Sequence, residues 1–196
     1  MWRRLNRNGK KKQPATRYPQ SQERGREEVR GSPAHLERVQ AGRPGTLKFE
    51  EVLEREGRLV YTNVGISMLP LLRQGKDLFV VEKRGPERLR AGDVVLYRRP
   101  PNQYVLHRIV EVREREYVIL GDNCVNREYG ITDGDILGIL TGVVRDGKLH
   151  TVTEKWYRLY SFFMVHGADV RIFFKRAVAY GKAGIKKLLG IRRTAA

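Results

Sequence analysis

Between residues 58 and 153 the sequence consists of short β-branched and aromatic runs separated by turn-forming residues. The runs are RLVYTNVGISM, KDLFVVEK, GDVVLYRR, QYVLHRIVEVRE, EYVILGD and DILGILTGVVRDGKLHTVT, with RQG, RAG, RRPPN and RDG at the turns. No helical pattern of ten residues interrupts them. This region therefore predicts a mainly β unit of antiparallel strands and excludes a helical bundle or a sheet of alternating strands and helices.

Charge divides the 196-residue chain into three parts. Residues 1–46 carry a net charge of +8 and residues 151–196 also +8, whereas residues 47–150 carry only +1. Residues 1–45 are poor in aliphatic side chains and predict a disordered basic arm. We therefore expect that arm, a β domain over 46–150 that begins with a short helix at 49–57, and a basic helical tail over 151–196. Cationic arms favour polyanionic partners.

The tail contains ADVRIFFKRAVAYGKAGIKKLLG, which has helical periodicity and an apolar face. That face predicts either binding to an anionic membrane surface or packing against the β domain. Gly181 and Gly184 predict a break or a weakened helix. No apolar run is long enough to cross a bilayer, and the basic N-terminus lacks the apolar core of a secretory signal. We therefore expect a peripheral membrane protein or a cytoplasmic one.

The chain has a single cysteine, Cys124, so no internal disulfide is expected. It has no Cys/His set with zinc spacing. The sequence predicts no metal and no cofactor.

Three residues of the β unit are candidates for acyl-transfer chemistry. Ser67 lies in VGISMLP, where serine is also a common turn residue. His107 lies in YVLHRIVEV, and alternation places it on the inward face of a strand. Its neighbour Arg108 is then expected in solvent on the other face. Asp122 ends an apolar strand in ILGDN, a position typical of turns. A serine, an imidazole and a carboxylate suffice for nucleophilic attack with general-base assistance.

The stretches GISMLPLLRQGKDLFVVE, LRAGDVVLYRRP, VLHRIVEV and YVILGDN resemble, in this order, the motifs of the signal peptidase I family. The resemblance covers about residues 60–143. The usual bacterial enzymes and LexA-type self-cleaving repressors have lysine where this chain has His107. The chain is thus similar to the endoplasmic-reticulum type.

This resemblance implies a signal peptidase/LexA-like fold of coiled antiparallel β-sheets and a serine endopeptidase that cleaves after a small residue. It implies Ser67 as nucleophile, His107 as general base and Asp122 as third member, with Glu128 and Asp133 as alternatives. It also implies that an extended polypeptide substrate adds as a strand to an exposed sheet edge. Gly65 departs from relatives that offer a hydroxyl to the oxyanion there, so backbone N–H groups would form the oxyanion hole.

Two functional hypotheses follow. The first is the endopeptidase, whose substrate could include its own basic arm at Ala41–Gly42. The second is a catalytically silent binding module whose arms bind an anionic membrane surface or nucleic acid. Nucleic acid is the less favoured partner, because Trp2 and Tyr18 are the few aromatic side chains of the first arm that could stack on bases.

Overall fold

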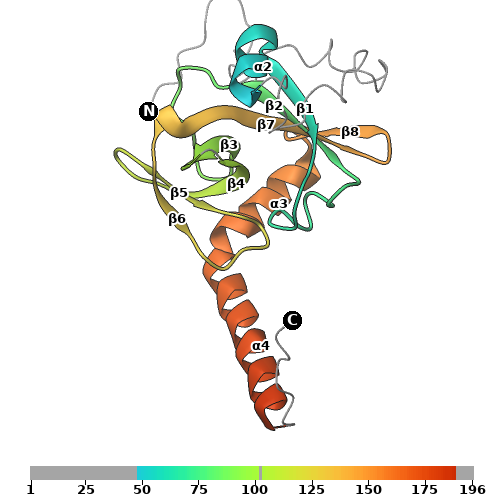
Figure 1. Ribbon diagram of the computed structural model, residues 1–196, viewed down its shortest axis with the longest axis vertical. Helices are drawn as coiled ribbons and strands as arrows, with labels where there is room; N and C mark the ends of the chain where they lie inside the picture. The colour runs from blue at the N-terminus through green and yellow to red at the C-terminus, as the bar shows by residue number, and fades with distance from the viewer. Residues whose placement is uncertain (1–47, 102, 189–196) are drawn as a thin grey trace, which may run out of the picture. The chain divides into compact units, whose positions relative to one another are not determined.

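The computed structural model describes residues 48–101 and 103–188. Eight antiparallel strands form one sheet (Figure 1), which confirms the mainly β prediction. Its hydrogen-bonded order is β1-β2-β7-β3-β4-β5-β6, and β8 pairs with β7. The expected disordered arm over 1–45 and its Ala41–Gly42 bond lie outside the described residues.

The strands have the following bounds: β1 Arg58–Thr62, β2 Leu78–Lys83, β3 Val94–Arg99, β4 Gln103–Val112, β5 Tyr117–Leu120, β6 Glu128–Ile131, β7 Ile136–Arg145 and β8 Lys148–Thr151. The helical elements are α2 Phe49–Glu56, the single 3₁₀ turn η2 Asp133–Asp135, α3 Lys155–His166 and α4 Ala168–Leu188.

Helix α2 confirms the short helix expected before the sheet. Phe49, Val52 and Leu53 are buried, as their helical spacing predicts. The helix ends at Gly57, whose φ of 69° is the left-handed conformation that glycine adopts most easily at a helix C-terminus.

Two features of the β unit differ from the sequence pattern. Strand β1 ends at Thr62, and residues 63–77 form a long loop of turns that contains Ser67. We call residues 63–77 the Ser67 loop. Strand β6 was not predicted, because EYGI has a single aliphatic side chain, that of Ile131, and follows a polar stretch. In the structure Ile131 is also its only buried residue. Its pairing with β5, and not its own hydrophobicity, makes it a strand.

Both faces of β4 are covered. One face joins a core cluster that includes Val95, Tyr97, Ile109 and Ile119. Against the other face packs α3, which contributes the buried residues Tyr157 and Ser161. A strand that is covered on both sides must satisfy polar side chains on both sides.

Helices α3 and α4 follow each other almost without interruption (Figure 1). The Gly167 N–H donates to the carbonyl of Phe163, and the Arg171 N–H donates to the carbonyl of Gly167. The break predicted at Gly181 and Gly184 is wrong, because α4 continues to Leu188. Two glycines cost a helix only about 1 kcal/mol each, which does not have to end it.

Within the described part of the chain, neither this helix nor any other is both long and apolar enough to cross a membrane.

Candidate active site

A cavity of about 660 Å³ brings Ser67 and His107 together, 40 residues apart in sequence. Ser67 comes from the loop between β1 and β2, and His107 from the middle of β4. Glu128, at the start of β6, lines the same cavity. Three of the residues that the sequence singled out therefore share one site.

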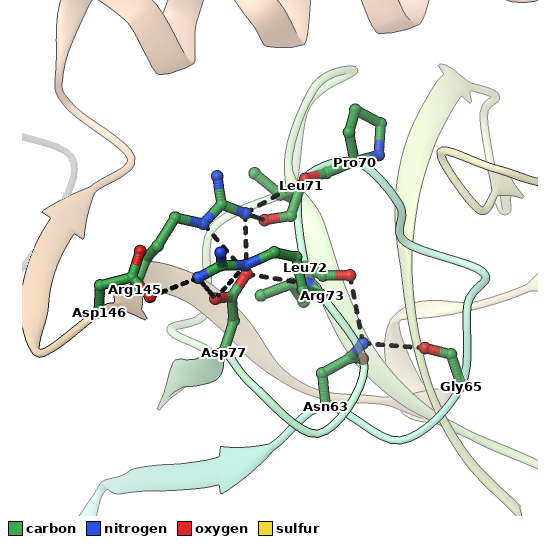
Figure 2. Close-up of polar contacts among 9 residues, drawn as sticks. All are labelled: Asn63, Gly65, Pro70, Leu71, Leu72, Arg73, Asp77, Arg145 and Asp146. Carbon is green, nitrogen blue, oxygen red and sulfur yellow. Dashed lines mark hydrogen bonds and ion pairs between the residues drawn. The ribbon is translucent and has the colours of Figure 1, made fainter.

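The Ser67 loop is anchored by a buried carboxylate. Asp77 is fully buried, and Figure 2 shows the guanidinium groups of Arg73 and Arg145 directed at it. Arg73 Nε and Nη2 donate to Asp77 Oδ1 over 2.9 and 2.8 Å, and Arg145 Nη2 donates to Oδ2 over 2.8 Å. Arg145 Nη2 also donates to the carbonyl of Leu71 over 2.8 Å. These bonds tie the loop to the end of β7.

Burial by itself would raise the pKa of Asp77. The hydrogen bonds from Arg73 and Arg145 outweigh that effect and lower the pKa of Asp77 from 3.8 to about 2. The carboxylate is therefore charged at neutral pH, and its charge contributes to the stability of the loop.

Two asparagines bind the main chain of the loop at and just before the serine. Asn63 Nδ2 donates to the carbonyl of Gly65 over 3.0 Å, within the loop itself (Figure 2). Asn123 reaches the loop from the turn after β5. Its N–H donates to the carbonyl of Ser67 over 2.7 Å, and its Nδ2 donates to the carbonyl of Ile66 over 3.0 Å. The main chain at Ile66 and Ser67 is thus tied to the turn that follows β5.

His107 is oriented by a carboxylate. Its Nδ1 lies 3.1 Å from Glu128 Oε1 and 3.4 Å from the hydroxyl of Tyr97. A carboxylate only accepts hydrogen bonds, so the proton of the neutral ring belongs on Nδ1 and Nε2 carries the lone pair. The other oxygen of Glu128 accepts a bond from Arg99 Nη1 over 3.1 Å, which fixes the rotation of the carboxylate.

The pKa of His107 is lowered from 6.5, chiefly because burial disfavours the imidazolium. The charge of Glu128 and its hydrogen bond act in the opposite direction, since they favour the protonated ring. At neutral pH the ring is therefore neutral and can accept a proton at Nε2.

Gly121 is the point where the parts of the site meet. A Cβ at this glycine would lie 2.8 Å from His107 Nε2, 2.9 Å from the carbonyl oxygen of Ser67 and 2.7 Å from Cys124 Sγ. His107 Nε2 and the carbonyl oxygen of Ser67 thus border the same small space, which only a glycine at position 121 leaves open. Between Ser67 and His107 themselves, both described, the structure shows no hydrogen bond.

With this geometry described, comparison with known proteins adds no relative. No protein-family model, curated protein or solved structure matches the chain. The candidate site therefore depends on the contacts above, and the relation to the signal peptidase I family stays a prediction from the sequence motifs.

Asp122, the preferred third member in the sequence analysis, is not bonded to His107. Its oxygens accept bonds from Arg108 Nε and Nη2, both over 2.8 Å, and from the hydroxyl of Tyr160 over 2.8 Å. The expectation that Arg108 is solvated is wrong, because α3 covers that face and leaves the side chain fully buried.

The carboxylate on the histidine is Glu128, one of the two alternatives. The other, Asp133, accepts a bond from Tyr117 and pairs with Arg84 instead.

Sequence reasoning missed Tyr97, Arg99 and the role of Gly121. Tyr97 and Arg99 lie on β3, which pairs with β4, so alternation along β3 directs both toward the His107 side of the sheet. That signal was present in VVLYRR. The closeness of Gly121 to His107 had no such signal, because it depends on how the turn after β5 folds back.

Proposed function

We propose that the protein is a serine endopeptidase in which Ser67 is the nucleophile and His107 the general base. The observation that carries the proposal is the arrangement of the His107 ring. Glu128 engages Nδ1, and Nε2 borders the same small space beside Gly121 as the carbonyl oxygen of Ser67. Glu128 is proposed to keep the ring in this tautomer and to stabilise the imidazolium that forms, in place of Asp122.

In the proposed reaction His107 Nε2 takes the Ser67 proton as Oγ attacks the scissile carbonyl. The C–N bond then breaks, and the imidazolium gives its proton to the leaving amine. Water hydrolyses the remaining ester with the same histidine as base. The main-chain N–H of Ser67 is the proposed oxyanion donor, because Gly65 has no side chain to offer.

The proposed substrate is an extended polypeptide with a small residue before the cleaved bond. Among the described strands, β1 is at one end of the hydrogen-bonded order and leads directly into the Ser67 loop, so its outer edge is the proposed pairing site for such a chain. Aromatic side chains from three elements, Phe49, Tyr61 and Tyr104, line the cavity beside it.

The basic arm is a proposed substrate as well. Phe49 lines the cavity, and Gly42 precedes it by seven residues, a length that spans at most about 25 Å when extended. Cleavage at Ala41–Gly42 would be seen by mass spectrometry of the purified chain on long incubation at raised pH. A chain that stays intact excludes this substrate but not the peptidase.

Acylation by a fluorophosphonate probe tests the proposal. Attack by Ser67 would form a P–O bond and expel fluoride, and peptide mass spectrometry would find the adduct on Ser67. We expect labelling of the wild-type chain and none of Ser67→Ala. If neither protein is labelled at any pH, the alternative of a catalytically silent binding module gains support, and retention of DNA or anionic vesicles would then identify its partner.

A further inference from the structure

Helices α3 and α4 expose an unusual number of large apolar side chains. Nine of them are between 43% and 76% exposed. They are Trp156, Leu159, Phe162, Phe163, Val170, Phe173, Phe174, Val178 and Tyr180. We call this set the apolar stripe.

The stripe occupies one face of each helix rather than a scatter of positions. With a rotation of about 100° per residue, its four members in α3 fall within an arc of about 120°, and its five members in α4 fall within an arc of about 160°. The opposite face holds the buried residues that pack on the sheet, among them Ser161, Ala168 and Ile172.

Basic side chains border the stripe on both sides. The same rotation places Arg158 beside the stripe in α3. In α4 it places Arg176 along one border and Arg171 and Lys175 along the other. Between residues 155 and 181 there are five Lys or Arg and one Asp. The acidic exception, Asp169, is paired with Arg127.

We propose that the apolar stripe binds the surface of an anionic lipid bilayer, with the helix axis lying in the plane of the interface. Apolar and aromatic side chains with basic residues on both borders are the composition of interfacial helices. A second copy of this chain fits less well, because it would bring a further cationic segment against this one. Each Lys or Arg near an anionic surface strengthens binding by about fivefold.

The stripe has a structural link to the candidate site. Lys175 on α4 donates from Nζ to the carbonyl of Asn123 over 2.7 Å, and Asn123 bonds the carbonyls of Ser67 and Ile66. A helix bound at the bilayer would thus hold the Ser67 loop near the lipid surface. This consequence rests on the proposed function, whereas lipid binding by the stripe does not.

Vesicle co-sedimentation of the full chain tests the proposal. We expect binding to phosphatidylcholine vesicles that contain about 30 mol % phosphatidylserine, and binding at least about tenfold weaker to phosphatidylcholine alone. The double variant Phe173→Ser/Phe174→Ser keeps every charge and should lower the affinity for the mixed vesicles by at least about tenfold. Val178→Ser/Tyr180→Ser, further along the stripe, should do the same.

A matched control replaces two exposed apolar residues of the sheet, Val112→Ser/Tyr129→Ser, which should bind as the wild type does. Circular dichroism and thermal melting check that each variant is folded. Equal binding by the stripe variants would overturn the proposal, because the cationic arms alone would then explain it. If the wild-type chain does not bind vesicles, the proposal is also overturned. Light scattering would then report whether the stripe instead joins two copies of the chain. Fluorophosphonate labelling without vesicles reports on Ser67 separately.

Discussion

Two neighbouring residues of β4 form pairs with carboxylates on opposite faces of the sheet. His107 meets Glu128 on the cavity face, where the side chains are 8% and 20% exposed. Arg108 meets Asp122 under α3, where the side chains are 0% and 1% exposed. Both pairs join β4 to a residue that follows β5, yet only one of them has an atom left over for chemistry.

In the Arg108 pair, every nitrogen of the guanidinium donates a hydrogen bond. Its guanidinium bonds both oxygens of Asp122, the carbonyl of Gly92 and the hydroxyl of Ser161. These bonds fasten α3 to the sheet. His107, in contrast, lines the cavity with Nδ1 engaged by Glu128, and its Nε2 lies beside Gly121. Saturated polar groups stabilise architecture, whereas a reactive group needs an unsatisfied atom near a cavity.

The largest effect is expected when the buried pair is broken. Asp122→Asn leaves the Arg108 charge buried without its counter-ion, and the free energy of unfolding should fall by about 3–5 kcal/mol. Urea denaturation measures this loss. The double variant Arg108→Met/Asp122→Leu should recover much of it, because it leaves no unpaired charge.

The comparison fails if Asp122→Asn is as stable as the wild type but is not acylated by the fluorophosphonate. That result would indicate that Asp122 acts on His107, as the third member that the sequence motifs imply.

The second prediction concerns the cavity-facing pair. Glu128→Gln removes the negative charge that orients His107 and stabilises its imidazolium, so the rate of acylation should fall about a hundredfold. Its unfolding free energy should change by less than about 1 kcal/mol, because Glu128 is partly exposed and also meets Arg99. A time course of quenched labelling reactions measures the acylation rate, and urea denaturation of the same protein measures its stability.

Asp133→Asn is the matched control for Glu128→Gln. Asp133 was also an alternative third member, but its carboxylate lies against Tyr117, Arg84 and Arg88. Its replacement should leave the acylation rate unchanged. A larger loss in Asp133→Asn than in Glu128→Gln would contradict the arrangement proposed here.

Local patterns predicted the sheet, helix α2 and the burial of His107, because alternation and helical spacing are properties of neighbouring residues. They could not decide between Asp122 and Glu128. The β4–β5 register shifts between Ile109 and Glu111, and the β5–β6 register shifts again between Tyr117 and Ile119. A shift of one residue moves a side chain to the other face, and nothing in the local sequence marks it.

The error at Arg108 has a different origin. Alternation placed it correctly on the face opposite His107, but the sequence did not show that α3 returns to cover that face, with Ser161 53 residues further along the chain. The long separation hides a contact that decides whether a charged side chain is in solvent or in an ion pair. Burial on both faces of a strand is a tertiary property.

Asp77 should behave like Asp122, as a structural carboxylate near the site. Its pKa is lowered to about 2, so its contribution to stability is complete above about pH 4 and is lost as the pH falls toward 2. Asp77→Asn should therefore cost about 2 kcal/mol at neutral pH and much less near pH 2. Asp146→Asn, which removes the exposed partner of Arg73, should cost less than about 0.5 kcal/mol. Equal effects of the two variants would place Asp77 outside the framework of the Ser67 loop.

The smallest effect expected is a shift in the pH dependence of acylation. This shift tests most directly whether Glu128, and not Asp133, acts on the His107 ring. The base must be neutral, and burial lowers the pKa of His107, so the rate should rise with pH through a midpoint below 6.5. Glu128 raises that pKa against the effect of burial, so Glu128→Gln should move the midpoint to lower pH. Asp133→Asn, the same control as before, should leave the midpoint in place. A midpoint that stays fixed in Glu128→Gln, or moves to higher pH, would mean that the carboxylate does not act on the ring, and the cavity-facing pair would then be as purely structural as the pair under α3.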